Sequence, residues 1–286
     1  MFDLATLEAE LAGTLFAGKL HFTRVTGSTN SDALAAARRG VPHGSVYFAD
    51  EQLTGRGRAH HGWISAAGEG LYVSILLRPP FPASRLPLLP LAAGLAASQA
   101  IRTVSGPAPS RSLIPSPGLE IDLRWPNDLL IGPRKTGGIL VESQTEPAQN
   151  KTARTGGVGA GSVAFAVIGI GINVHQRIFP RGLATPATSL DLELGKQLSR
   201  QTLLVALLKS LQREASALAD PAAAATIPAR VEQASTWARG RSVLVHGPQS
   251  CQGVTAGLDE NGFLRVATAE GLITVRTGGL RAAEKG

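Results

Sequence analysis

Residues 163–174 are almost wholly apolar, reading Val-Ala-Phe-Ala-Val-Ile-Gly-Ile-Gly-Ile-Asn-Val. A strand with one face in water alternates apolar and polar residues, so this run indicates a central strand that is buried on both faces. Other secondary-structure elements must therefore cover both faces of such a strand. We therefore expect a β-sheet flanked by helices.

The chain alternates between strand-like and helix-like segments up to about residue 239. Strands are predicted at residues 21–26, 45–49 and 71–77, and helices at residues 88–104 and 199–218. A further helix is predicted to end at Gly40, and Ser28, Thr29 and Asn30 offer N-caps for it. Residues 120–124 and 139–142 are predicted to pair as a hairpin. The segments 105–118 and 144–161 are predicted to be loops.

The pattern changes after Arg239. Four short strands are predicted near residues 242–246, 253–258, 263–267 and 272–275. Asn261-Gly262 between two of them is a strong signal for a hairpin turn. We therefore expect an α+β protein with two domains. Residues 1–239 would form a mixed sheet flanked by helices, and residues 240–286 a small β-barrel.

Composition limits the class of protein. Of 286 residues, 43% are hydrophobic and 17% charged, as in an ordinary globular protein. A single cysteine, Cys251, rules out an intrachain disulfide, and the longest apolar stretch is broken by Pro87 and Pro90. We expect a cytoplasmic protein without a membrane partner. The net charge of +7 leaves a nucleic-acid partner open, although the basic residues are scattered.

A glycine–arginine loop, Gly55-Arg56-Gly57-Arg58, is the first segment with a chemistry of its own. Glycine lets backbone N–H groups approach an anion closely, and arginine adds bidentate hydrogen bonds to its oxygens. The loop therefore predicts a phosphate site. A flexible surface loop and an RNA-binding arginine–glycine patch have the same composition and stay open as alternatives.

The segment Arg124-Trp125-Pro126-Asn127-Asp128 is followed seven residues later by Lys135. Asp128 and Lys135 lie at the two ends of a predicted strand–turn–strand, and Gly137-Gly138 let the backbone pass close to a bound molecule. A carboxylate, a lysine and two arginines suit the activation of a carboxylic acid by a triphosphate. A plain buried ion pair is the alternative.

The central strand ends in Gly169-Ile170-Gly171-Ile172-Asn173. Small residues and an asparagine at a strand end can accept a flat ring such as adenine, and they can equally serve tight packing. No dinucleotide fingerprint follows, and the sequence contains no P-loop, no metalloprotease motif and no pair of cysteines for a metal.

These segments, in this order, make the chain similar to the biotin protein ligases. The matching residues are Ser28-Thr29-Asn30, Gln52, Gly55 to Arg58, Trp63, Arg124 to Asp128, Lys135 to Glu142, Gly169 to Asn173 and Ala187-Thr188-Ser189-Leu190. The resemblance implies the biotin/lipoyl ligase fold with an SH3-like C-terminal barrel. It also implies a ligase that forms biotinoyl-5′-AMP from biotin and ATP, with Mg²⁺ carried by ATP. The biotin would then pass to a lysine of a biotin carboxyl carrier protein or domain.

The resemblance also implies roles for individual residues. Biotin would be bound by Ser28, Thr29, Asn30, Gln52, Arg56, Gly57, Arg58, Lys135 and Gly138. ATP would be bound by Arg56, Arg58, Trp63, Asn127, Asp128, Lys135 and Asn173. Lys135, Arg58 and Asp128 would be catalytic, with Asp128 placing the incoming lysine amine. No protein-held metal is expected.

Two segments depart from the usual family pattern. Ala59-His60-His61-Gly62 stands where a glycine and a further basic residue are usual, and Arg124 stands where lysine is usual. The first predicted strand begins near His21, so we expect no helix-turn-helix domain before it and no sequence-specific DNA binding. Monomer and homodimer both stay open.

Two other functions are compatible with the sequence. A lipoate or octanoate ligase or transferase would have the same fold, but the transferase needs a cysteine nucleophile that the predicted catalytic domain lacks. A non-catalytic basic protein that binds nucleic acid would show salt-sensitive binding and no nucleotide turnover.

Overall fold

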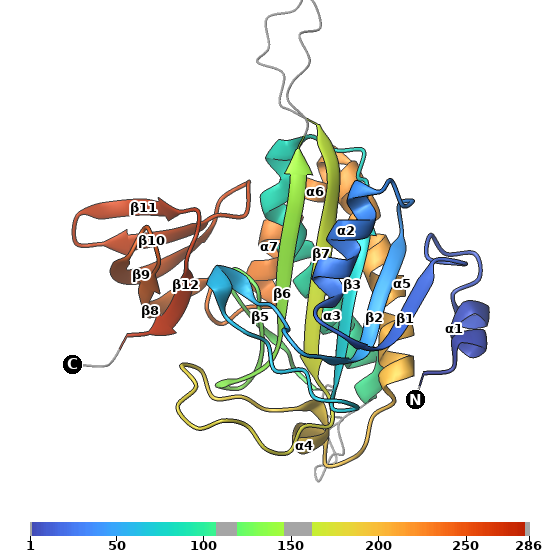
Figure 1. Cartoon of the computed structure of the whole chain (residues 1–286). Helices are drawn as coiled ribbons and strands as arrows, with labels where there is room; N and C mark the ends of the chain where they lie inside the picture. The colour runs from blue at the N-terminus through green and yellow to red at the C-terminus, as the bar shows by residue number, and fades with distance from the viewer. Residues whose placement is uncertain (1, 107–118, 146–161, 284–286) are drawn as a thin grey trace, which may run out of the picture.

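Two β-sheets organise the chain in a computed structural model that describes residues 2–106, 119–145 and 162–283 (Figure 1). The larger sheet has seven strands in the order β1-β2-β3-β7-β6-β5-β4. Strands β1 and β2 pair in parallel, and the other neighbours are antiparallel. The strands are β1 (Leu20–Thr26), β2 (Ser45–Gln52), β3 (Gly70–Leu77), β4 (Asp122–Arg124), β5 (Asp128–Ile131), β6 (Arg134–Thr145) and β7 (Val163–Asn173).

Strand β7 lies at the centre of this sheet, between β3 and β6. Side chains alternate between the two faces of a strand, so Ile168 and Ile170 join the main hydrophobic core while Phe165 and Val167 join a second cluster. The second cluster includes Ala33 and other residues of helix α2 (Thr29–Arg38). Both faces of β7 are therefore covered, which confirms the prediction of a strand buried on both sides.

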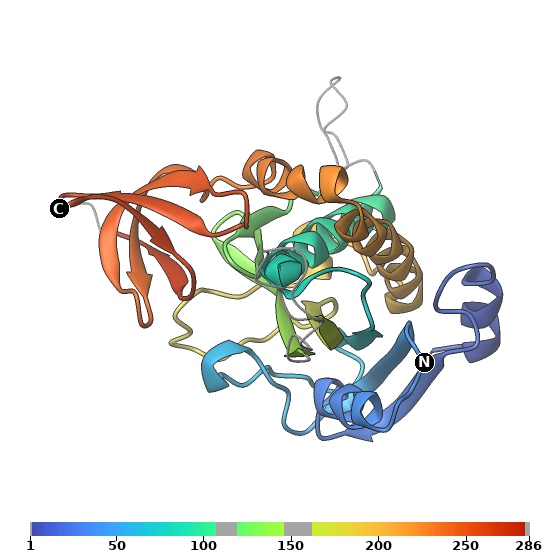
Figure 2. The same ribbon diagram turned by 90° about the horizontal axis from the view of Figure 1, so that it is seen from above.

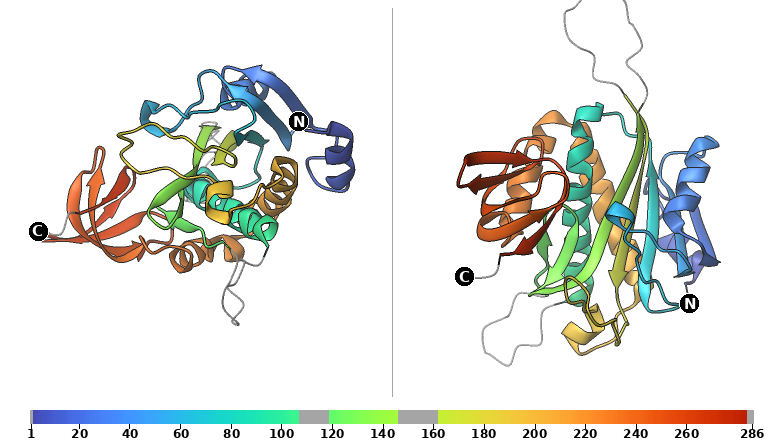
Figure 3. Two further views of the ribbon diagram at one scale, coloured as in Figure 1. Left: turned by 90° about the horizontal axis from the view of Figure 1, so that it is seen from below. Right: turned by 60° about the vertical axis from the view of Figure 1, so that its left-hand side comes forward.

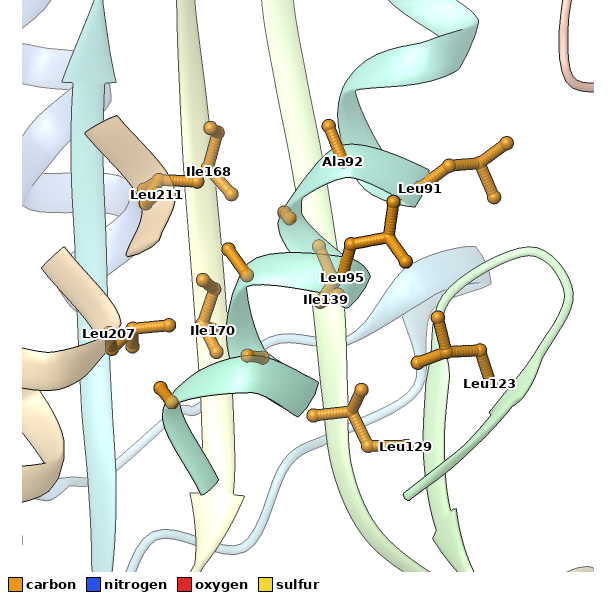
Figure 4. Close-up of a cluster of buried hydrophobic side chains, with 14 of the residues drawn as sticks. Leu91, Ala92, Leu95, Leu123, Leu129, Ile139, Ile168, Ile170, Leu207 and Leu211 are labelled. Atoms are coloured by element: carbon orange, nitrogen blue, oxygen red, sulfur yellow. The ribbon is translucent and has the colours of Figure 1, made fainter. Parts of the chain in front are cut away.

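Helices α3 (Leu89–Ser105) and α5 (Arg200–Ala219) cover the face opposite α2. Figure 4 shows Leu211 and Leu207 of α5 beside Ile168 and Ile170 of β7, and Leu95 of α3 beside Ile139 of β6. Leucines recur three and four residues apart along α5, so they form one apolar stripe. The other helical segments are α1 (Leu4–Glu10), η1 (Arg58–His60), η2 (Ala83–Leu88), α4 (Leu190–Leu194), α6 (Pro221–Ala225) and α7 (Ile227–Gln233). No helix within the described ranges is long and apolar enough to cross a bilayer.

The second sheet follows in the C-terminal part of the chain and is antiparallel throughout, in the order β11-β10-β9-β8-β12. Its strands are β8 (Arg239–His246), β9 (Cys251–Leu258), β10 (Leu264–Thr268), β11 (Gly271–Val275) and β12 (Gly279–Ala282). It stands to one side of the larger sheet (Figure 2, Figure 3). The indole Nε1 of the buried Trp125 donates to the carbonyl oxygen of Gly262 at 3.0 Å and joins the two parts.

The predicted strands and long helices are present, with three corrections. Residues 120–124 do not pair with 139–142, because β5 lies between β4 and β6 and takes the hairpin position. The C-terminal sheet has a fifth strand, β12, beyond the four that were predicted. The short helices α1, α4, α6 and α7 and the 3₁₀ segments η1 and η2 were not predicted. Of the two predicted loops, residues 107–118 and 146–161 lie outside the described residues.

Candidate active site

A cavity of about 520 Å³ opens between the larger sheet and the C-terminal sheet. All the site residues named from the sequence line it: Ser28, Thr29, Asn30, Gln52, Arg56, Gly57, Arg58, Trp63, Asn127, Asp128, Lys135, Gly138 and Asn173. Segments far apart in the sequence therefore meet at one place. Their individual roles stay a prediction.

Lys135 and Asp128 face each other across the β5–β6 hairpin. The Nζ of Lys135 lies 2.5 Å from Oδ1 of Asp128, whose side chain is 15% exposed. The backbone of Lys135 is held by the segment that follows β7, since its N–H donates to the Pro186 carbonyl and its own carbonyl accepts from Thr188 N–H. The lysine is therefore fixed at the cavity wall by both its side chain and its backbone.

Arg124 holds the other oxygen of the same carboxylate. Its Nε and Nη2 donate to Oδ2 of Asp128 at 3.1 and 2.6 Å, and Nη2 also donates to Thr185 Oγ1. The guanidinium lies 5.1 Å from the ring centre of Trp237. Burial raises the pKa of Asp128, but the charges of Lys135 and Arg124 and their hydrogen bonds outweigh it and hold the pKa below the usual aspartate value. The site therefore keeps one ionised carboxylate between two cations.

Arg58 links the glycine–arginine loop to both sheets. Its Nη1 donates to Asn127 Oδ1 at 3.2 Å and to the carbonyl oxygen of Gly278 at 3.1 Å. Burial lowers the pKa of Arg58 and the charge of Asp128 opposes this, yet a guanidinium starts from so high a pKa that it stays charged. A third fixed cation therefore faces the cavity near Asp128.

The floor of the cavity beside α2 is a chain of hydrogen bonds. The backbone N–H and the hydroxyl of Thr29 both donate to Gln52 Oε1, at 2.9 and 3.0 Å. The Thr29 hydroxyl also lies 2.8 Å from Ser74 Oγ, which donates to Oδ1 of Asn30. Gln52 therefore takes the place of an N-cap at the start of α2. Ser28, an expected cap, is at the N-cap position but makes no side-chain capping bond.

Three buried polar atoms at the cavity have no hydrogen-bond partner among the described residues: Ser28 Oγ, Trp63 Nε1 and Gln176 Oε1. Buried polar groups in proteins are normally paired, so these atoms are suited to a ligand that brings both donors and acceptors. The ureido ring of biotin and the base of ATP are both of this kind. The residues present therefore fit the two substrates expected from the sequence. Within the described part of the chain, no cluster of three or more His, Cys, Asp or Glu could hold a metal ion.

The indole of Trp63 lies against the glycines of the central strands. A Cβ placed on Gly171 would come within 2.5 Å of Trp63 Nε1, and one on Gly138 would lie 3.5 Å from the same ring. The amide of Asn173 donates to the carbonyl oxygen of Thr188. These glycines thus make room for a flat ring, and in this structure that ring is Trp63.

Other residues at the site were missed by the sequence reasoning. The C-terminal sheet contributes His246 at the end of β8, Gly278 in the turn before β12 and Arg281 in β12, and Gln176 comes from the segment after β7. The pKa of His246 is lowered, first by burial and then by the charges of Arg281 and Arg124. No motif marks these positions, because a residue that approaches the site from another sheet carries no local signal.

Known proteins resemble this chain in sequence and in fold. The biotin/lipoate A/B protein ligase family matches residues 22–161. The bifunctional ligase/repressor BirA of Bacillus spizizenii is 36% identical over 63% of this chain, and the chain spans 49% of that protein's length. A structure of the biotin protein ligase from Aquifex aeolicus in complex with biotin and ATP has a TM-score of 0.71 at 27% identity, covering 93% of this chain and 100% of that one.

The biotin--[acetyl-CoA-carboxylase] ligase of Mycobacterium tuberculosis is 33% identical over 258 residues, which cover 88% of this chain and 85% of that protein. The chain belongs to the biotin protein ligase family. This confirms the resemblance and the fold class expected from the sequence, a mixed sheet flanked by helices. The second antiparallel sheet is consistent with the SH3-like domain expected for the family.

Proposed function

We propose that this chain is an ATP-dependent biotin ligase that acts in two steps. In the first, a carboxylate oxygen of biotin attacks the α-phosphorus of Mg-ATP, and pyrophosphate leaves. In the second, the amine of an acceptor lysine attacks the carbonyl carbon of biotinoyl-5′-AMP. The C–N bond forms, the C–O bond to phosphate breaks, AMP leaves and the amine loses a proton. The acceptor is a biotin carboxyl carrier protein or domain.

One observation carries this proposal: Lys135, Arg124 and Arg58 surround Asp128 at the wall of the cavity. The first step brings the carboxylate of biotin against the phosphates of ATP, and both are anions. Fixed cations at the point where they meet lower the cost of that approach and of the charge that develops in the transition state.

Each residue would have its own role in the two steps. Lys135 and Arg58 would lie against the biotin carboxylate and the α-phosphate, with Arg56 at the rim. The polar floor of Thr29, Asn30 and Gln52 would hold the ureido ring by donors and acceptors. Asp128 would orient Lys135 in the first step and accept a hydrogen bond from the acceptor amine in the second.

The same proposal covers the domains. Residues 1–239 would form the catalytic domain and residues 240–286 a second domain that completes the cavity. The two separate sheets support this division. The bond from Arg58 to the Gly278 carbonyl supports the role of the second domain in completing the cavity.

The experiment is a single-turnover assay of pyrophosphate release from Mg-ATP, with and without biotin. Wild type should release pyrophosphate only with biotin, and Lys135→Ala should lose this release by at least about a hundredfold. Lys209→Ala is the matched control, because Lys209 is an exposed lysine on α5 outside the cavity. Release driven by lipoate or octanoate would keep the fold and change the substrate. If no carboxylic acid drives release, the ligase proposal is wrong.

A second assay addresses the acceptor. After the adenylate has formed, addition of a carrier domain should give AMP and a biotinylated lysine in equal amounts. Salt-sensitive binding of nucleic acid in the absence of any turnover would favour the nucleic-acid alternative instead.

A further inference from the structure

Glu142 on β6 uses its two carboxylate oxygens for two different parts of the site. Oε1 accepts from Nη2 of Arg56, in the glycine–arginine loop, at 2.7 Å. Oε2 accepts from the amide nitrogen of Asn30, in the first turn of α2. One side chain therefore connects the loop to the floor of the cavity.

The Asn30 end of this connection is rigid. Asn30 is 5% exposed, and its Oδ1 accepts from the hydroxyl of Ser74, which is fully buried. The bond to Glu142 fixes which way the amide of Asn30 points, with nitrogen toward Glu142 and oxygen toward Ser74. The Arg56 end is more open, because the side chain of Arg56 is 42% exposed and that of Glu142 28%.

We propose that Glu142 is a positioning residue, which holds Arg56 at the rim of the cavity and keeps the Asn30 amide in the orientation that biotin meets. Its effect on biotin rests on the proposed function above. Its effect on the loop does not.

The geometry leaves Arg56 able to bind a substrate while it is held. A guanidinium has five N–H donors, and the bonds of Arg56 are one from Nη2 to Glu142 and one from Nη1 to Ser31 Oγ at 3.3 Å. The remaining donors can reach a carboxylate or phosphate oxygen in the cavity that Arg56 lines. Glu142 therefore orients the arginine without occupying all of it.

A carboxylate is required at position 142 because both neighbours are donors. A glutamine there has a single acceptor oxygen and an NH₂ group, so it satisfies either Arg56 or Asn30 and presents a donor to the other. Glu142→Gln should therefore release one of the two connections with almost no change in shape. Ion pairs as exposed as this one add little to global stability, so the variant should still fold.

The first test is amide hydrogen exchange of the loop without any substrate. The N–H groups of Gly57 and Trp63 are bonded to the carbonyls of His61 and Gly55, at 2.7 and 2.8 Å. Glu142→Ala, which removes both connections, should raise their exchange rates several-fold and leave the exchange of β7 unchanged. Glu214→Ala is the control, because Glu214 pairs with Arg230 on the helices outside the cavity. Unchanged loop exchange in Glu142→Ala overturns the proposal.

The second test is a double-mutant cycle on the apparent KM for biotin. Glu142→Ala and Arg56→Ala should each raise KM by about tenfold, with a smaller change in kcat, and the double variant should lose less than the two single effects combined, because the part of the Glu142 effect that acts through Arg56 is already absent. Fully additive free-energy effects would show that Glu142 does not act through Arg56 and would overturn the proposal. Failure of wild type to turn over biotin refutes the proposed function, whereas the exchange result then still decides the role of Glu142 in the loop.

Discussion

Asp128 Oδ1 lies 2.5 Å from Lys135 Nζ, while its second oxygen accepts from two nitrogens of Arg124. Both oxygens are thus committed to cations within the protein. A carboxylate held in this way stays ionised below the pH at which a free aspartate takes up a proton. Asp128 with its two cations is therefore a fixed electrostatic unit, and Asp128 does not act as a general acid or base near neutral pH.

The first prediction concerns acid stability. The folded pKa of Asp128 is depressed, so its stabilising contribution is present above the unfolded value of 3.8 and is lost as the pH falls through the folded value. Asp128→Asn should lower the free energy of unfolding at pH 7 by about 1–3 kcal/mol. The deficit relative to wild type should shrink below pH 3.8. Urea unfolding of both proteins at pH 7 and pH 3 measures this, and a deficit that does not depend on pH would contradict it.

The second prediction concerns the arginine that stands where the family usually has lysine. Arg124→Lys keeps the charge but loses the two-nitrogen contact to Asp128, the bond to Thr185 and the stacking on Trp237. We expect a loss of about 1–3 kcal/mol in the free energy of unfolding and slower transfer to the acceptor. Arg134→Lys, at a half-exposed pair with Glu193, should change stability by less than about 0.5 kcal/mol. Equal losses in the two variants would show that the fork geometry of Arg124 is unimportant.

The third prediction concerns the room at Gly171. A Cβ there would lie 2.5 Å from Trp63 Nε1, so Gly171→Ala should push the indole out of its place. We expect the KM for ATP to rise by about tenfold, because a displacement of about an ångström is costly at a packed binding site. Gly94→Ala, whose Cβ would meet Ile139 and Leu123 at an ordinary 3.6 Å, should leave that KM unchanged. Steady-state kinetics with ATP as the varied substrate compares the two, and the change in tryptophan fluorescence between Gly171→Ala and wild type reports the displacement of the indole.

The fourth prediction concerns the junction between the sheets. Trp125→Phe keeps most of the buried ring but removes the donor to the Gly262 carbonyl. We expect a loss of about 1–2 kcal/mol in the free energy of unfolding. Hydrogen exchange should rise in β10 and the turn before it rather than in β7. Thermal unfolding measures the loss of stability, and hydrogen-exchange mass spectrometry measures the local effect. Faster exchange across the whole chain would mean that the effect of losing this bond is not confined to the junction.

Much of the fold was accessible from the sequence because its signals are local. The almost wholly apolar run at 163–174 identified the central strand, and the leucine spacing in residues 199–218 identified α5. Strand β5 was missed because it has only four residues and begins with the polar Asp128. Helix α1 has seven residues, and an isolated helix that short has little stability without packing.

The site residues also fall into those that local motifs predict and those that depend on tertiary contacts. The motifs in residues 52–58, 124–128 and 135–138 each bring residues to the cavity wall. Glu142 was named only as the end of a matching segment, because its importance depends on Asn30 and Arg56 arriving from elsewhere. The contributions of His246 and Arg281 depend on how the second sheet is placed. Spacing along the chain cannot report that placement.

The hydrogen bond from Arg58 to the Gly278 carbonyl joins residues 220 positions apart. A growing chain must therefore have been synthesised beyond Gly278 before this arginine can reach its final position. The larger sheet can assemble earlier, since its last strand ends at Asn173. During synthesis, a folded catalytic sheet would thus exist for a time without a complete cavity. The cavity is therefore completed only when Gly278 and β12 have followed, after the larger sheet has formed.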